Sequence, residues 1–214
     1  MKRILCYGDS NMWGHVPAKG TRYPEDTRWP CVMGTLLGPE YTVLEDSISG
    51  RTTLFEDPFA PCRCGRENLG YALLANAPID LLILALGTND LKYTNAAGTA
   101  RGLARMIELI RNADAVYSSY SPIFSTPQMP ILLVAPPLID ERIAVLRPEH
   151  TLAGAAAESR ALPGLLAQLA REKGTAFIDL SVLAQPSIAD CLHLTAEGHR
   201  TVGRAMAEKV RTLL

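Results

Sequence analysis

The chain has 214 residues, of which 48% are hydrophobic and 20% charged, and its formal net charge at pH 7 is −1. This composition supports a folded core without help from metals or disulfides, and the near-neutral charge provides no basic field for nucleic acid or anionic lipid. We therefore expect no nucleic acid and no membrane among the principal partners, and we expect a small molecule to be the ligand.

Apolar segments predict the strands of a sheet. The first is Arg3–Tyr7, and a weaker, alternating one follows at Tyr41–Glu45. Three more are predicted at Leu81–Leu86, Ile131–Ala135 and Ala176–Asp179. The segment that begins at Leu81 is apolar without a break, which is typical of a central parallel strand covered on both faces.

Helical patterns lie between these strands. One helix is expected to end at Leu37, and the others are expected at Glu67–Ala75, Ala97–Ala113, Ala153–Glu172 and Ala196–Leu213. Asp26 or Thr27 is a candidate cap for the first, and Pro163 predicts a kink or a late start in the fourth. Strands that alternate with helices predict a three-layer α/β/α sandwich with a central parallel sheet. Because there is no repeat and no linker, we predict one domain, residues 1–214.

The chain has five cysteines, an odd number at irregular spacing: Cys6, Cys31, Cys62, Cys64 and Cys191. Such a set predicts reduced thiols in a cytoplasmic protein. Cys62 and Cys64 are a weak indication of a metal site, because no further ligand lies at a suitable spacing. We expect no metal. The apolar run after Arg3 is too short for a signal peptide, and no segment has transmembrane length.

Polar residues gather where the predicted strands end. The first strand leads into Gly8-Asp9-Ser10, the second into Ser49-Gly50-Arg51-Thr52 and the third into Gly87-Thr88-Asn89-Asp90, while Asp190-Cys191-Leu192-His193 follows the last. Each group alone has a simpler explanation as a helix cap or a turn. In an open α/β sheet, however, function collects at the carboxyl ends of the strands. Together the groups provide a nucleophile, a base, an acid and oxyanion donors at one edge.

These separated blocks, in this order, resemble the SGNH hydrolases of the GDSL esterase family. The extended segment from Gly8 to Gly14, together with Ser49–Thr53, is most similar to the arylesterase and acyltransferase branch. Asn11 stands where the family has the Leu that contributes to its name, at a position that is not catalytic. The resemblance implies the flavodoxin-like SGNH hydrolase fold and catalysis without a cofactor.

The chemistry follows from these residue types. Ser10 is the predicted nucleophile, because a serine hydroxyl attacks an ester once a base removes its proton. His193 is the predicted base, and Asp190, three residues earlier, is predicted to orient its imidazole. The resemblance implies an oxyanion hole made by the backbone N–H groups of Ser10 and Gly50 and the side-chain amide of Asn89.

Other residues have weaker assignments. Trp13, Thr88 and Leu192 are expected to bind substrate, although packing is an equally good explanation for Trp13. Arg51 is expected either to pair with a carboxylate beneath the site or to be exposed. Asp9 and Asp90 are expected to hold loops, and three histidines are expected to be surface or structural residues: His15, His150 and His199.

The expected function is that of a serine esterase for small acyl esters, acting through an acyl-serine with water or an alcohol as acceptor. The same machinery serves acyl-CoA thioesterases and carbohydrate acetylesterases, which are the alternatives. A binding module for a phosphate-bearing ligand is disfavoured, because the chain has neither a P-loop nor a G-x-G-x-x-G motif.

A homo-oligomer is also expected, partly because the resemblance implies subunits whose loops border the site. Trp13 and the pair Ile123-Phe124 are predicted to expose apolar area that a second subunit would cover. The Ser- and Pro-rich segment Ser118–Pro130 is the candidate contact.

Overall fold

A computed structural model describes all 214 residues. Its five-stranded sheet has the order β2-β1-β3-β4-β5, and every neighbouring pair is parallel. The strands are β1 (Lys2–Gly8), β2 (Tyr41–Ser47), β3 (Leu81–Ala85), β4 (Ile131–Ala135) and β5 (Ala176–Asp179). All the predicted strands are present, and the apolar segment at Leu81 is the central strand.

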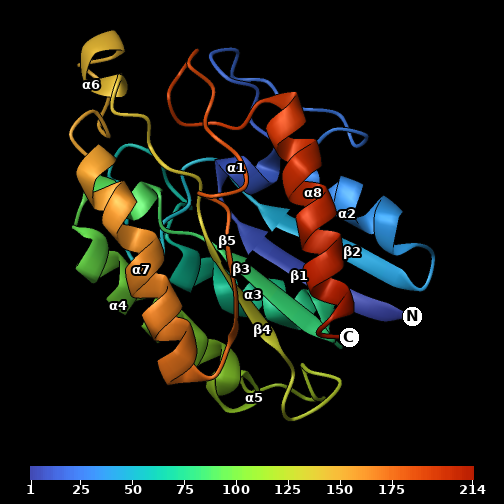
Figure 1. Ribbon diagram of the computed structural model, residues 1–214. Helices are drawn as coiled ribbons and strands as arrows, with labels where there is room; N and C mark the ends of the chain where they lie inside the picture. Colours follow the sequence, from blue (N-terminus) through green and yellow to red (C-terminus); the bar gives the residue numbers. More distant parts are fainter.

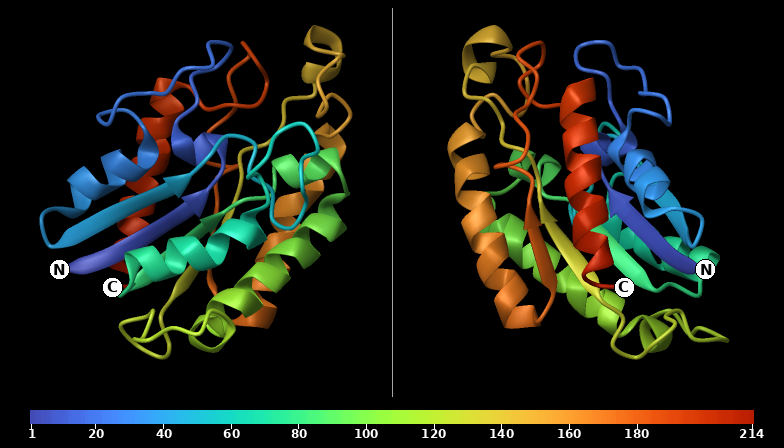
Figure 2. Two further views of the ribbon diagram at one scale, coloured as in Figure 1. Left: turned by 180° about the vertical axis from the view of Figure 1, so that it is seen from behind. Right: turned by 45° about the vertical axis from the view of Figure 1, so that its right-hand side comes forward.

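Helices cover both faces of the sheet (Figures 1 and 2). They are α1 (Ser10–Trp13), α2 (Trp29–Leu37), α3 (Gly65–Asn76), the 3₁₀ turn η1 (Asn89–Lys92), α4 (Ala96–Arg111), α5 (Ala113–Val116), α6 (Ile143–Leu146), α7 (Ala156–Lys173) and α8 (Ala196–Arg211). Helices α3, α4 and α7 pack on one face, and α2 and α8 on the other. The prediction of a three-layer α/β/α sandwich is confirmed.

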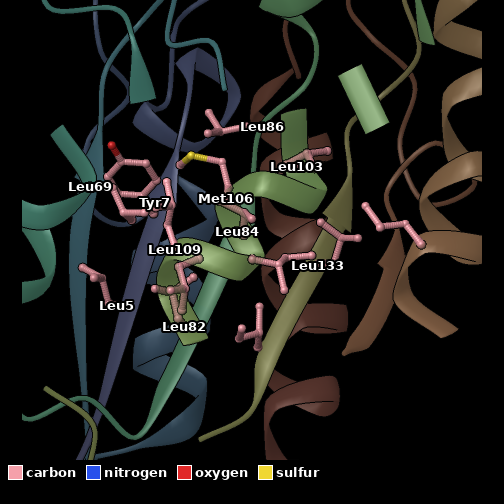
Figure 3. Packing of buried hydrophobic residues seen from close by; sticks show 14 of the residues in the cluster. Leu5, Tyr7, Leu69, Leu82, Leu84, Leu86, Leu103, Met106, Leu109 and Leu133 are labelled. Carbon is pink, nitrogen blue, oxygen red and sulfur yellow. The ribbon is translucent and has the colours of Figure 1, made fainter. Parts of the chain in front are cut away.

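Successive side chains of each strand enter different cores, because they point to opposite faces of the sheet. In β1, Leu5 and Tyr7 pack against α3 and α4 (Figure 3), whereas Ile4 and Cys6 face α2 and α8. All of these side chains are fully buried. The sheet is therefore packed on both faces, and the loop that carries Ser10 is attached to a buried strand.

Two helix starts differ from the predictions. Neither Asp26 nor Thr27 caps α2; the preceding residue is Arg28, whose guanidinium has no acceptor for the first N–H groups of the helix and instead donates to Glu45 at 2.8 Å. Helix α7 begins later than predicted and continues through Pro163. Buried leucines on both sides of Pro163 pack against the sheet, and this packing compensates for the hydrogen bond that proline cannot make.

The segment between α5 and β4 lies at the amino end of the sheet, far from α1 (Figure 1). The prediction that Ile123 is exposed is wrong: its side chain is fully buried, and its N–H donates to Asp114 at 2.8 Å. Phe124 is partly buried against the same core. The pair Ile123-Phe124 therefore forms no joint surface with Trp13. None of the helices combines the length and the apolarity needed to cross a bilayer.

Candidate active site

The strand order places a crevice between β1 and β3. From β1 the chain moves outward to β2 and then returns to β3 on the other side of β1. Ligands of open α/β sheets bind at such a switch point, outside the carboxyl ends of the strands. Here β1 leads directly to Ser10, and β3 leads to Asn89 at the start of η1.

Ser10 is held at the start of a helix of four residues. Asp9 caps this helix, since its Oδ1 accepts the N–H of Asn11 at 3.0 Å. Gly8 makes the tight exit from β1 possible: a Cβ there would lie 2.6 Å from the sulfur of Met12. The abrupt change from strand to helix therefore turns the Ser10 hydroxyl toward the crevice, with only 8% of the residue exposed.

Ser10, His193 and Asp190 lie in one hydrogen-bonded chain. Ser10 Oγ is 3.0 Å from Nε2 of His193, and Nδ1 of the same ring is 2.8 Å from Oδ2 of Asp190. Because the carboxylate accepts the proton of Nδ1, the neutral ring presents an unprotonated Nε2 to the serine. This arrangement can remove the hydroxyl proton during nucleophilic attack.

The segment Asp190–His193 is a tight turn. Oδ1 of Asp190 accepts the N–H groups of Leu192 at 3.1 Å and His193 at 3.0 Å, and Cys191 adopts a left-handed conformation with φ of 65°. Burial raises the pKa of the Asp190 carboxyl, but hydrogen bonds from His193 outweigh it and hold that pKa well below its usual range. The carboxylate therefore stays ionised opposite the imidazole.

Asn11 connects α1 to the histidine turn. Its Nδ2 donates to the carbonyl of Leu192 at 3.2 Å, and its Oδ1 accepts the N–H of Leu194 at 3.0 Å. These two bonds bind the backbone on both sides of His193. The residue that departs from the family pattern thus connects the helix of Ser10 to the turn that carries His193.

Backbone donors face the same crevice. Neither the N–H of Ser10 nor that of Gly50 donates to an acceptor within the chain. Gly50 has φ of 86°, and a Cβ there would be strained and would press on the Arg63 side chain at 3.3 Å. Both N–H groups are therefore free to bind an oxyanion.

The side-chain amide of Asn89, the third expected oxyanion donor, is bonded to other groups of the protein. Its Nδ2 donates to the carbonyl of Arg51 at 3.2 Å and to Oδ2 of Asp9 at 3.5 Å. The second bond is long, so it is the one that an oxyanion can replace at small cost. The amide lies beside Ser10 with its donor already directed by two protein acceptors.

Arg51 lies beneath the site, and the first of its two alternatives is the correct one. It is 3% exposed, its Nη2 is 2.7 Å from Oδ1 of Asp46, and its guanidinium lies 4.0 Å from the ring centre of Tyr7. It also donates to the carbonyl of Gly8 at 3.3 Å. Arg51 therefore ties the Gly50 loop to the end of β1.

Two carboxyl groups are buried under the crevice. Burial raises the pKa of Asp9 to about 6 and that of Asp90 to about 7. Asp90 accepts the backbone N–H of Thr53 at 3.1 Å and also its hydroxyl. These bonds connect η1 to the segment after Gly50, which agrees with a loop-holding role.

The crevice contains a small pocket of about 160 Å³. It is lined by Ser10, Asn11, His15, Ser49, Gly50, Thr88, Asn89, Lys92, His150, Leu152, Leu192 and His193. Two of the residues predicted to bind substrate, Thr88 and Leu192, are in this wall. The Thr88 hydroxyl oxygen is buried within this wall and has no hydrogen-bond partner in the chain.

Trp13, the third residue predicted to bind substrate, lies outside this pocket. It borders a neighbouring hollow of about 380 Å³ with His15 and Arg63. The left-handed Gly14 ends α1 immediately after Trp13, and Nε of Arg22 donates to the Trp13 carbonyl at 2.7 Å. Trp13 therefore lines the neighbouring hollow and not the pocket over Ser10, whereas His15 borders both and stacks on His193.

Sequence reasoning missed His15, His150 and Lys92 as pocket residues. The His15 ring stacks on His193 with 4.0 Å between ring centres, and burial lowers its pKa. Burial also lowers the pKa of Lys92. Lys92 follows Asn89 by one turn of η1, a spacing that could have indicated its place; His150 lies in a loop without any periodic signal.

Two groups of side chains come close enough to suggest a metal ion. In the first, ligand atoms of His15, Asp190 and His193 lie within 4.8 Å of one another. The two rings are stacked, however, so their in-plane lone pairs do not converge on one point, and Oδ2 of Asp190 is already bonded to His193. This geometry fits proton transfer rather than a cation.

The second group is Glu56, Cys64 and Glu67. Both glutamates are exposed, and burial raises the pKa of the Cys64 thiol, which disfavours the thiolate that a metal requires. Neither Cys62 nor Cys64 forms a disulfide.

The parallel sandwich and the Ser–His–Asp chain at its carboxyl edge define a serine hydrolase of the α/β class. Residues 6–201 match the model of the GDSL-like lipase/acylhydrolase family. The chain belongs to this family, and it is a carboxylic ester hydrolase.

Solved structures agree with this assignment over the full chain. An aryl esterase from M. smegmatis is 30% identical with a TM-score of 0.89, and both chains are covered to 100%. Est24, a carbohydrate acetylesterase from Sinorhizobium meliloti, is 30% identical with a TM-score of 0.90 and the same coverage. Another carbohydrate acetylesterase family member from that organism is 34% identical, with a TM-score of 0.88 over 100% of this chain and 99% of the other. No curated protein sequence matches the chain.

Proposed function

We propose that this protein hydrolyses small acyl esters with Ser10 as nucleophile, His193 as general base and Asp190 as the group that orients it. The observation that carries the proposal is the continuous chain of hydrogen bonds, 3.0 Å from Ser10 Oγ to Nε2 and 2.8 Å from Nδ1 to Asp190, beside two unused backbone N–H groups.

Acylation begins when Ser10 Oγ attacks the ester carbonyl and its proton passes to Nε2 of His193. The carbonyl oxygen becomes an oxyanion, which accepts the N–H groups of Ser10 and Gly50 and the amide of Asn89. The imidazolium, stabilised by the Asp190 carboxylate, then protonates the leaving alcohol. An acyl-Ser10 remains.

Deacylation repeats these steps with water. Nε2 of His193 removes a proton from the water that attacks the acyl carbonyl, and the same donors bind the second oxyanion. When the intermediate collapses, the proton returns to Ser10 Oγ and the carboxylic acid leaves.

The pocket supports a short acyl group. A volume of about 160 Å³ with only two hydrophobic lining residues, Leu152 and Leu192, has little room for a long chain. An acetyl ester of a phenol or of a carbohydrate fits best, in agreement with what the similar structures are described to be. An acyl-CoA thioesterase remains an alternative on the same machinery.

Acyl transfer to an alcohol remains a prediction, and the geometry now favours water. The expectation of an apolar acceptor site depended on Trp13 and Leu192, but Trp13 lies outside the pocket. His15, Ser49 and Thr88 make the wall polar, and a polar wall offers water the hydrogen bonds that it needs.

The test is labelling with a fluorophosphonate, followed by peptide mass spectrometry and by rates on 4-nitrophenyl acetate. The label should be on Ser10, and Ser10→Ala should lose both labelling and hydrolysis while keeping its circular dichroism spectrum. Ser49→Ala is the matched control, because this second pocket serine has no base bonded to it. Full labelling of Ser10→Ala would place the nucleophile elsewhere.

We also propose a cytoplasmic location and a homo-oligomeric state. Five free cysteines support a reducing compartment. Exposed apolar side chains around the carboxyl end, such as Phe59 and Val145, support burial between subunits. Light scattering over a range of protein concentrations tests the assembly.

A further inference from the structure

The titratable groups that line the pocket all belong to basic residues. They are His15, Lys92, His150 and His193, and no carboxylate is in the wall. A pocket meant only for an acetyl group needs one histidine and the oxyanion donors. The additional basic groups therefore require an explanation.

Lys92 is the only lysine of this wall, and its ammonium takes part in no hydrogen bond or ion pair of the chain. Asp57, Asp9 and Asp90 attract the Lys92 ammonium, but none of them lies within ion-pair distance of it. Asp57 accepts the N–H of Phe59 at 2.9 Å, Asp9 accepts that of Asn11, and Asp90 accepts from Thr53. Taking an ammonium partly out of water without a partner costs free energy, which a bound anion would recover.

His150 places a neutral donor in the same wall. Its Nδ1 accepts the N–H of Leu152 at 3.1 Å, so the ring proton is on Nε2. Burial lowers the pKa of His150, and the positive charges of Arg147 and Lys92 act in the same direction. The uncharged ring therefore remains a hydrogen-bond donor in the same pocket wall as Lys92.

We propose that this pocket selects esters that carry a carboxylate close to the scissile bond, with the carboxylate bound by the Lys92 ammonium and the His150 ring. The inference rests on the proposed esterase function and adds the class of substrate. An ammonium and a neutral N–H donor together match the two oxygens of a carboxylate, whereas a carboxamide of the same shape offers only one acceptor oxygen.

Two pairs of esters test this preference. Monomethyl succinate and methyl succinamate carry the anionic or neutral group on the acyl side. O-Acetylglycolate and O-acetylglycolamide carry it on the alcohol side. Within a pair a carboxylate is replaced by a neutral amide of the same shape, and in at least one pair we expect kcat/KM for the acid to exceed that for the amide by about tenfold, as a charge-assisted hydrogen bond allows. The pair that discriminates shows on which side of the ester Lys92 lies.

Two variants show whether Lys92 causes the preference. Lys92→Met should bring the acid-to-amide ratio close to one, and Lys92→Arg, which keeps the charge, should retain a preference. Lys209→Met is the matched control, since this lysine lies at the far end of α8.

Equal rates for acid and amide in both pairs would overturn the inference, and so would a ratio that survives Lys92→Met. If the folded protein hydrolyses none of these esters and does not hydrolyse 4-nitrophenyl acetate, the proposed function itself fails.

Discussion

At the carboxyl end of the sheet, polar side chains are buried where apolar ones would otherwise pack, whereas apolar contacts close the amino end. Asp9, Asn89 and Asp90 are all less than 7% exposed. At the amino end, Ile79 and Ile123 are fully buried, and Asp80 provides the polar contact by accepting the N–H of Arg3 at 2.8 Å.

The larger hollow is at the amino end. It has about 500 Å³ and is bordered by Phe124, Met129 and Ile131, while the pocket over Ser10 has about 160 Å³. Volume therefore does not identify the site. The buried polar groups do, because their desolvation is tolerated only where hydrogen bonds fix them in one arrangement.

The comparison predicts that one carboxylate at the carboxyl end matters more than any apolar residue at the amino end. In Asp190→Asn, the retained oxygen can still accept from Leu192, but the new NH₂ faces Nδ1 of His193. The ring would then carry its proton on Nε2 and could not accept the proton of Ser10. We expect kcat on 4-nitrophenyl acetate to fall by about 10⁴-fold, as in serine proteases.

Asp26→Asn is the control for this change, because Asp26 is exposed and far from the ring. A loss of less than tenfold in Asp190→Asn would contradict the assigned role of the carboxylate.

The next effect concerns the oxyanion. Asn89→Ala should lower kcat by about 10²–10³, the usual cost of removing one oxyanion donor, with little change in KM. Asn76→Ala, which removes an amide from α3 at the other end of the molecule, is the matched control. If kcat of Asn89→Ala stays within a factor of two of the unaltered protein, the long bond from Asn89 to Asp9 is structural and the amide does not serve the oxyanion.

The amino end should show the opposite response. Ile123→Ala removes a fully buried side chain, and we expect about 3 kcal/mol less free energy of unfolding in urea. Because Ile123 is at the opposite edge of the sheet from Ser10, kcat at low temperature should not change. A selective loss of kcat with unchanged stability would show that the two ends are coupled.

His199 is a buried histidine outside the active site, and it makes the stability of the protein depend on pH. The side chain of His199 is fully buried, its Nδ1 accepts the N–H of Trp29 at 3.4 Å, and burial lowers its pKa to about 4. Between about pH 6.5 and pH 4 the unfolded chain binds a proton that the folded chain does not, so the stability present above pH 6.5 is lost on acidification. From about pH 7 to pH 5 the loss is about 2 kcal/mol.

Asp9 and Asp90 act in the opposite sense, because their raised pKa values, about 6 and about 7, stabilise the fold as pH falls through that window. Between pH 7 and pH 5 these two carboxyl groups together outweigh His199. His199→Gln removes only one side of this balance. Its stability relative to the unaltered protein should improve by about 2 kcal/mol from pH 7 to pH 5 in urea titrations. An identical pH dependence of the two proteins would refute the assignment.

The sequence could predict the strands and the residues at the strand ends, but it could not predict the short helices. Apolar runs such as Ile131–Ala135 specified the strands, because a period-two or unbroken apolar pattern is a direct consequence of burial. The blocks around Ser10 and His193 were predictable because strand exits in a parallel sheet share one edge. Short helices such as α6 were not, since four residues are too few to show a period.

The rest of the pocket depends on backbone turns that no pattern encodes. Trp13 and His15 are both close to Ser10 in sequence and are separated by the left-handed Gly14, but only His15 lines the pocket over Ser10. His150 reaches the pocket from a loop whose path depends on tertiary contacts. Arg51 left two alternatives open, and only the observed contact with Asp46 decides between them.

The smallest expected effect is that of replacing Asn11. This replacement tests whether polar contacts at the carboxyl end of the sheet position the catalytic groups or only fill space. Asn11→Ala removes both bonds to the backbone around His193, leaving the carbonyl of Leu192 and the N–H of Leu194 without these partners. Because the ring must stay 3.0 Å from Ser10 Oγ, looser backbone at Leu192 and Leu194 should lower kcat by about tenfold and leave KM nearly unchanged.

Asn11→Leu separates the two explanations, since leucine restores the volume without the hydrogen bonds. If the bonds position His193, the leucine variant should be as slow as the alanine variant on 4-nitrophenyl acetate. If leucine restores kcat to the level of the unaltered protein, packing alone sets the distance between Ser10 and His193. The free energy of unfolding, measured in parallel, should fall by about 1–3 kcal/mol in both variants, because each leaves the same buried backbone groups unpaired.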